Sequence, residues 1–188
     1  VYLGRFADAE LALEAMRAKT PDDPDVILGL ALLRTYSADY EEALVLLKQA
    51  VHKKPNVARI YVLISLVLAK LHRTDEAIEF YQSASELNPD DERLSRVESA
   101  ILMEQGRFGE ALKSLSGYAL SHPNDPWDVW NDLGTLYYIH EQYEQAEESF
   151  RFAIEAAEAM GLSIPFVHFN LALCYNARGK YEDAKEQL

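Results

Sequence analysis

The sequence predicts an all-α solenoid of antiparallel helix pairs, and three observations lead to this fold class. One is a repeat of 34 residues, seen in four prolines and four alanines at the same interval: Pro21, Pro55, Pro89 and Pro123, with Ala9, Ala43, Ala77 and Ala111. A second is the spacing of apolar residues at i, i+3, i+4 and i+7, which is typical of one face of a helix. The third is that the linking segments are rich in Pro, Asn and Asp, which end one helix and cap the next.

Each repeat is therefore expected to hold two helices. The predicted boundaries are a partial repeat over 1–23, full repeats over 24–57, 58–91, 92–126 and 127–164, and a partial repeat over 165–188. Residues 1–3 are expected to end a first helix. Because both ends cut through a repeat, we expect 1–188 to be a single solenoid domain from a longer protein.

Three copies depart from the common pattern. In the third full repeat, polar residues stand at the positions of Trp130, Leu133 and Gly134, namely Ser95, Glu98 and Ser99. An apolar stripe of Leu94, Val97 and Ile101 begins one residue earlier, which predicts a first helix with a shifted inward face. The second has His72 where others have Gly, which predicts a weaker turn. In the fourth, four extra residues are expected to lengthen the second helix by about one turn.

The repeat also carries a family resemblance. In 127–164 the helix-turn-helix unit has a characteristic set of residues: Trp130, Leu133, Gly134, Tyr137, Tyr143, Ala146, Phe150 and Ala153. This unit resembles the tetratricopeptide repeat, and the resemblance covers essentially the whole chain. It implies a right-handed superhelical solenoid of antiparallel helix pairs. Gly134 and Ala146 are expected to let the two helices approach closely, while the larger side chains fill the surrounding space.

Charge and apolar patterning exclude several classes of partner. The formal net charge is −13 with a pI of about 4.8, which argues against binding nucleic acid phosphates or anionic lipid headgroups. The longest apolar stretch, 60–71, is too short for the roughly 20 residues that cross a bilayer, so we expect no direct membrane insertion. Cys174 is the single cysteine and is predicted to be a small core residue. Its isolation favours a cytoplasmic location, although the compartment stays open.

No catalytic, cofactor-binding or metal-binding residues are predicted. The five histidines do not follow a metal-ligand spacing, and His168 takes the position of Trp130 in its own repeat, which favours a packed core histidine. The glutamates of 141–158 are expected to form a solvated outer face. The protein is accordingly predicted not to be an enzyme, with no cofactor.

The first helix of each repeat is expected to line a concave groove, as the resemblance implies. The predicted groove residues lie at positions two, five, nine and twelve of the repeats: Leu28, Leu32, Arg59, Val62, Leu66, Arg93, Arg96, Asn131, Thr135, Tyr138, Phe166, Phe169, Leu173 and Asn176. Leu66→Asp or Phe169→Asp should then weaken partner binding with little loss of helicity. Alternatively, helices that are apolar nearly all round, such as 60–71, are buried under another part of the protein or a second copy.

The predicted function is a non-enzymatic scaffold that binds a peptide or helix of a partner protein in this groove. One alternative is a docking or oligomerisation arm of a larger multidomain enzyme or of a secretion or assembly factor. Homo-oligomers through the apolar groove or the uncapped ends are a further alternative. An RNA-binding helical repeat has a similar period, but the negative charge disfavours it.

Overall fold

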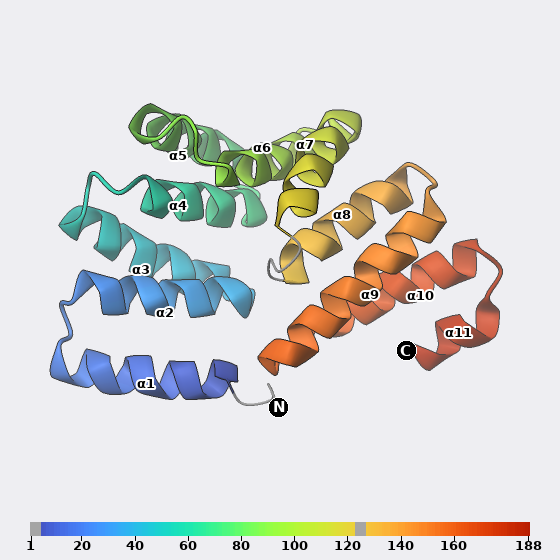
Figure 1. Ribbon diagram of the computed structural model, residues 1–188, viewed down its shortest axis with the longest axis horizontal. Helices are drawn as coiled ribbons and strands as arrows, with labels where there is room; N and C mark the ends of the chain where they lie inside the picture. The colour runs from blue at the N-terminus through green and yellow to red at the C-terminus, as the bar shows by residue number, and fades with distance from the viewer. Residues whose placement is uncertain (1–4, 123–126) are drawn as a thin grey trace. The chain divides into compact units, whose positions relative to one another are not determined.

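The computed structural model describes residues 5–122 and 127–188, and this portion holds eleven α-helices (Figure 1). They are α1 Arg5–Lys19, α2 Pro24–Tyr36, α3 Tyr40–Lys53, α4 Ala58–Lys70, α5 Thr74–Leu87, α6 Arg93–Glu104, α7 Phe108–Ser121, α8 Trp127–Ile139, α9 Tyr143–Met160, α10 Pro165–Ala177 and α11 Tyr181–Glu186. The expected helix end at residues 1–3 and the recurring Pro123 lie outside the described residues. Four of the predicted pairs pack together, namely α2 with α3, α4 with α5, α8 with α9 and α10 with α11, and the chain is an all-α helical-repeat solenoid.

The turn inside each pair has one backbone geometry, which recurs along the chain. One residue at each turn has a left-handed conformation, with φ between 57° and 73°: Ala38, His72, Gly106, Glu141 and Gly179. The next N–H donates to the carbonyl five residues earlier, as from Asp39 to Arg34 at 2.8 Å and from Arg73 to Leu68 at 2.9 Å. This is the Schellman ending of a helix, for which Gly is the residue of least strain.

Small residues are buried at recurring positions in the first and second helices of the repeats. The first helices bury a small residue at equivalent positions: Ala31, Ser65, Ser99, Gly134 and Ala172. The second helices bury the recurring alanine, which is fully inaccessible at Ala43, Ala77, Ala111 and Ala146. In α4 and α5 the contact includes a hydrogen bond from the Ser65 hydroxyl to the Ala77 carbonyl at 2.5 Å. The predicted close approach of Gly134 and Ala146 is confirmed by their burial.

The irregular copies fold as their sequences predict. Helix α6 buries the stripe of Leu94, Val97 and Ile101 and leaves Glu98 exposed, as predicted, but it also buries Ser99, so the inward face includes both the early stripe and the usual small position. Helix α9 has 18 residues, whereas α3, α5 and α7 have 14 each, which confirms the lengthened second helix. His72 forms the same left-handed turn as its counterparts. The predicted weakening of this turn concerns the free energy of unfolding and stays a prediction.

The contacts divide the chain into two compact units, of which one comprises Phe6–Arg107 and the other contains Phe108–Leu188. The first unit, α1 to α6, has a continuous apolar core that includes Leu30, Leu47, Ile64 and Val97. The second, α7 to α11, buries Trp127, Leu136 and Phe150. The boundary falls within the predicted repeat 92–126, so a single domain over 1–188 stays a prediction. Within the described residues, no helix is both long and apolar enough to cross a membrane.

Candidate functional site

In the first unit, the predicted groove residues of α2 and α4 contribute little open surface. Leu28 and Leu32 are half-buried and pack against the core. Val62 and Leu66 are only 3% and 2% exposed, because α4 packs against α3, α5 and α6. A partner cannot reach these two side chains, so we leave them out of the candidate site. Helix α4 is buried, as a helix that is apolar on all sides is expected to be, but neighbouring helices of this chain cover it, and neither a second copy nor a further part of the protein is needed.

The arginines predicted for the same groove have different environments. Arg93 forms a double contact with Asp91, from Nε to Oδ1 at 2.8 Å and from Nη2 to Oδ2 at 2.6 Å. Asp91 also accepts the backbone N–H of Arg93 at 3.1 Å, which stabilises the start of α6. The Arg93 guanidinium holds the pKa of Asp91 below its usual value. Arg93 therefore has a structural role, Arg96 is half-buried, and Arg59 is exposed.

In the second unit, α8 and α10 bring the remaining predicted residues onto neighbouring helices. The side chain of Asn170 donates from Nδ2 to Oδ1 of Asn131 at 3.1 Å, which joins the two helices. Thr135 lies one turn after Asn131 and donates its hydroxyl to the Asn131 carbonyl at 2.9 Å. The ring of Phe166 meets that of Trp127 edge to face, with centroids 5.4 Å apart. Tyr138 and Asn176 extend this polar border along α8 and α10.

Three large apolar side chains on α10 are exposed and form what we call the α10 stripe. Phe166, Phe169 and Leu173 are 45%, 52% and 38% exposed. Their spacing of i, i+3 and i+7 places them on one face of the helix. A contiguous exposed apolar row with a polar border is typical of a protein interaction site. The stripe is the part of the predicted groove that is open to a partner.

A second feature of this unit, which the sequence analysis did not identify, is an apolar hollow among α7, α8 and α9. It has a volume of about 280 Å³, and six residues provide its apolar lining: Ala119, Leu120, Trp130, Leu133, Tyr137 and Phe152. The rings of Trp130 and Phe152 are in contact in its wall, with centroids 5.3 Å apart. The repeat pattern explains Trp130, Leu133 and Tyr137 as packing residues. Leu120 and Phe152 are the residues that could have indicated this hollow from the sequence, because they are apolar but do not belong to the repeat pattern. In the structure they are 84% and 44% exposed.

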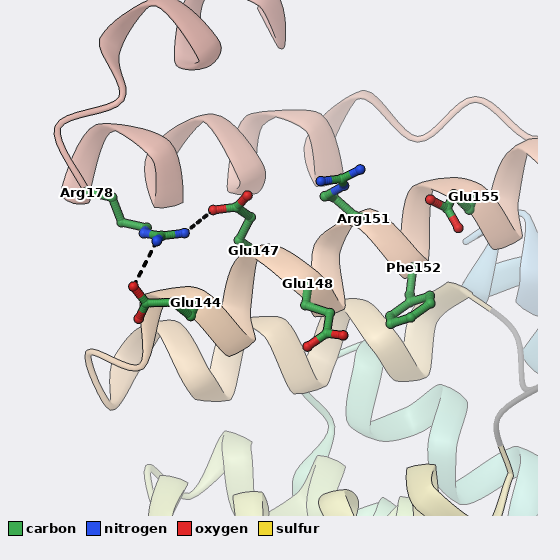
Figure 2. A pocket seen from close by; sticks show the side chains of 7 residues that line it. All are labelled: Glu144, Glu147, Glu148, Arg151, Phe152, Glu155 and Arg178. Carbon is green, nitrogen blue, oxygen red and sulfur yellow. Dashed lines mark hydrogen bonds and ion pairs between the residues drawn. The ribbon is translucent and has the colours of Figure 1, made fainter.

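A charged hollow of about 360 Å³ lies beside the apolar one and shares Glu148 and Phe152 with it. Figure 2 shows Arg178, at the end of α10, reaching two glutamates of α9. Its guanidinium donates to Glu144 at 2.8 Å and also to Glu147, which accepts a further bond from Lys180 at 3.0 Å. The predicted solvated face of α9 is thus only partly solvated, because the Glu147 side chain is 14% exposed.

The cysteine and the histidine that were considered as catalytic or metal-binding candidates both make structural contacts. Cys174 is fully buried and donates its thiol to the Tyr143 carbonyl at 3.1 Å, and burial raises its pKa to about 11. This confirms a core cysteine. His168 is half-buried rather than in the core, with Nδ1 3.0 Å from the side-chain oxygen of Gln187. Within the described part of the chain, no three His, Cys, Asp or Glu side chains are grouped so as to hold a metal.

Comparison with known families gives matches over most of the chain. Two models described as "Tetratricopeptide repeat" match it, one over residues 35–101 and the other over residues 101–160 and 131–187. Together they extend over both units.

Solved structures are similar in fold. MamA (residues 41 to the end) from Desulfovibrio magneticus RS-1 is 20% identical with a TM-score of 0.55, covering 87% of this chain and 90% of that one. A tetratricopeptide repeat protein from Parabacteroides merdae is 15% identical with a TM-score of 0.65, covering 98% and 70%. Human IFIT1, solved as a dimer with PPP-AAAA, is 19% identical with a TM-score of 0.70, covering 97% and 45%. At these identities the similarity establishes the fold alone.

Proposed function

Because the chain belongs to the tetratricopeptide repeat family, we propose that it is a protein-interaction scaffold that binds a segment of a partner through the α10 stripe. The observation that carries this proposal is the exposure of Phe166, Phe169 and Leu173 on one face of α10. Fully burying an exposed side chain of this size is worth roughly 1.5–3 kcal/mol, and these three are about half exposed, so each can add roughly half of that amount to a binding free energy.

The border of the stripe indicates the kind of segment that fits. Asn131, Thr135 and Tyr138 on α8 are half-buried, and Asn176 on α10 is exposed. Amide and hydroxyl groups beside an apolar row can pair with the backbone of an extended segment or with polar side chains of a helix. The proposed ligand therefore carries two or three apolar anchors, with specificity from hydrogen bonds at the border.

In this proposal the chain itself has no catalytic role. Repeat proteins of this family generally serve as non-catalytic scaffolds. The buried Cys174 thiol, with its pKa of about 11, is poorly suited to act as a nucleophile at neutral pH. The proposed activity is recruitment of a partner protein, either by this chain alone or by this chain as the docking arm of a larger protein. Human IFIT1 is an example of a longer protein that contains a similar array, since the match covers 45% of its chain.

The proposal can be tested with a displayed library of random 12-residue peptides selected on the purified protein. Affinities of enriched peptides would then be measured for the unmodified protein, Phe169→Asp and Leu11→Asp. Leu11 is 70% exposed on α1 and provides a matched control in the first unit. We expect peptides with apolar anchors, a loss of affinity of at least about tenfold for Phe169→Asp, and no loss for Leu11→Asp.

Equal peptide affinity of Phe169→Asp and the unmodified protein, with unchanged circular dichroism, would contradict the α10 stripe as the binding site. Light scattering on the same proteins tests whether the stripe instead holds two copies of this chain together. A dimer that Phe169→Asp dissociates would mean that the stripe is covered by a second copy. Salt-dependent binding of single-stranded RNA would contradict the protein-ligand assignment and the exclusion of nucleic acid drawn from the charge.

A further inference from the structure

The apolar hollow is separate from the α10 stripe, although both use α8. Asn131, Thr135 and Tyr138, which border the stripe, follow one face of α8 at i, i+4 and i+7. The hollow is lined instead by Trp130, Leu133 and Tyr137, which occupy another face. A ligand in the hollow therefore contacts a different set of side chains from a ligand on the stripe.

The hollow has the features of a pocket for an apolar side chain. Three aromatic rings, two leucines and Ala119 line it, and the rings of Trp130 and Phe152 are in contact, with centroids 5.3 Å apart. Its polar lining is Ser116, Gln145, Glu148 and Ser149. Leu120 on α7 is 84% exposed at its edge, which leaves that apolar side chain in water when the hollow is empty. A pocket of about this size, with an aromatic wall and a polar edge, can accept a large apolar anchor from a partner.

The rim of the hollow is negatively charged. Helix α9 carries five glutamates and one arginine. Two of the glutamates are ion-paired, because Arg178 binds Glu144 and Glu147 and Lys180 also binds Glu147. Among the residues that the structure describes, Glu148 and Glu155 have no ion pair, and Glu148 lines both the apolar and the charged hollow (Figure 2). Positive charge on a ligand therefore has carboxylates available directly beside the apolar pocket.

We propose that the apolar hollow and the adjoining glutamates form a second binding surface, for a basic amphipathic segment of another protein. A large apolar side chain of that segment packs into the hollow against the contacting rings of Trp130 and Phe152, and a Lys or Arg within about one helical turn of it pairs with Glu148 or Glu155. This surface does not depend on the α10 stripe, so the protein can hold two partners, or two segments of one partner, at once.

Charge decides among the possible occupants. A second copy of this chain carries a formal charge of −13 and would be repelled by the acidic rim. Nucleic acid and anionic lipid are disfavoured for the same reason. A basic protein segment matches both the apolar lining and the charged rim. It is the occupant to which the proposal commits.

The test uses fluorescently labelled helical peptides of 16 residues, built from Lys, Ala and Gln with one central Trp. Two matched peptides replace the Trp by Ala, or every Lys by Glu. Binding is measured by fluorescence anisotropy to the unmodified protein and to four variants. Leu120→Gln and Glu148→Lys alter the hollow and its rim. Phe169→Asp alters the α10 stripe, and Leu11→Gln is the control for an exposed leucine elsewhere.

We expect the Trp–Lys peptide alone to bind. Leu120→Gln should weaken its affinity about fivefold or more, since an apolar contact beside the pocket is lost without a change of charge. Glu148→Lys should weaken it about threefold or more, with a smaller effect in 0.5 M NaCl. Phe169→Asp and Leu11→Gln should leave it unchanged. Circular dichroism of all four variants should match that of the unmodified protein.

Three results would overturn the proposal. Equal binding of the Trp and Ala peptides would mean that charge alone attracts the peptide and the pocket is unused. Binding lost in Phe169→Asp but kept in Leu120→Gln and Glu148→Lys would assign the peptide to the α10 stripe. A dimer in light scattering that Leu120→Gln dissociates would mean that a second copy covers the hollow.

Discussion

The ring of Phe150 lies directly over Gly134, so that a Cβ atom at position 134 would come within 2.7 Å of two ring carbons. Gly134 belongs to α8 and Phe150 to α9, the two helices of one repeat. The absent side chain of one residue thus creates the space that the other fills. The distance between these helices is fixed by that pair.

Gly134→Ala should therefore destabilise the protein by about 1–3 kcal/mol, because the ring or the helices must move. Gly117→Ala is a matched control. Gly117 lies within α7, and an added Cβ there would have no neighbour within 4 Å. Alanine should stabilise that helix by about 0.5–1 kcal/mol. Urea unfolding followed by circular dichroism measures both, and equal effects at the two sites would show that Phe150 does not set the spacing.

The left-handed turns provide a second prediction. Glu141 and Ala38 have φ values of 58° and 60°, where L side chains are strained and glycine is not. Glu141→Gly and Ala38→Gly should each raise the free energy of unfolding by about 0.5–1 kcal/mol. Gly106→Ala should lower it by a similar amount, since an added Cβ there meets no neighbour within 4 Å and only the conformation is penalised. Destabilisation by Glu141→Gly would contradict this account of the turns.

The ion pairs of Glu147 are expected to contribute to stability. Arg178 and Lys180 both bind this half-buried carboxylate. Glu147→Gln should cost about 1–2 kcal/mol at low salt, and the cost should shrink in 1 M NaCl. The neighbouring Glu148 is exposed, so Glu148→Gln should change stability by less than about 0.5 kcal/mol. A similar cost for both substitutions would contradict a specific role of the Glu147 pairs.

The sequence predicted the helix pairs well, because their spacing repeats a packing requirement. Gly134, its small counterparts and the recurring alanines occupy positions that must be small in every copy, and this produces a pattern that can be read without a structure. The shifted stripe of Leu94, Val97 and Ile101 was predictable for the same reason, since an apolar face at helical spacing must be buried.

The candidate site was only partly predictable, because helical position does not determine exposure. Leu66 and Phe169 were assigned to the same open groove, yet Leu66 is 2% and Phe169 is 52% exposed. Which helices pack around α4 and α10 decides this difference, and it involves residues distant in the sequence. The apolar hollow was missed because Trp130 and Tyr137 pack within the repeat with one side and line the hollow with the other.

Cys174 gives a prediction about pH. Burial raises the pKa of its thiol from an ordinary value near 9 to about 11, so the folded state favours the neutral thiol. In the unfolded chain the thiol loses its proton at lower pH. This contribution to stability is therefore complete below about pH 9 and decreases as the pH rises toward 11. Urea unfolding at pH 8, 9, 10 and 11 should show the decrease, with Cys174→Ala as the control that lacks this component.

Chemical labelling checks the same site independently. Iodoacetamide should not modify Cys174 in the folded protein at pH 8, and it should do so readily in urea. Rapid labelling of the folded protein would contradict the buried position of the thiol. An alkaline decrease of equal size in Cys174→Ala would assign the effect to tyrosines instead.

Leu66→Asp and Phe169→Asp should separate core from surface. Sequence reasoning expected both substitutions to spare the fold, but Leu66 lies in the apolar core of the first unit. Placing an aspartate there buries a charge without a partner, so Leu66→Asp should cost about 4 kcal/mol or more and reduce helicity. Phe169→Asp replaces an exposed side chain and should change stability by less than about 1 kcal/mol. Thermal unfolding by circular dichroism distinguishes them, and a Leu66→Asp variant as stable as Phe169→Asp would mean that α4 opens to solvent.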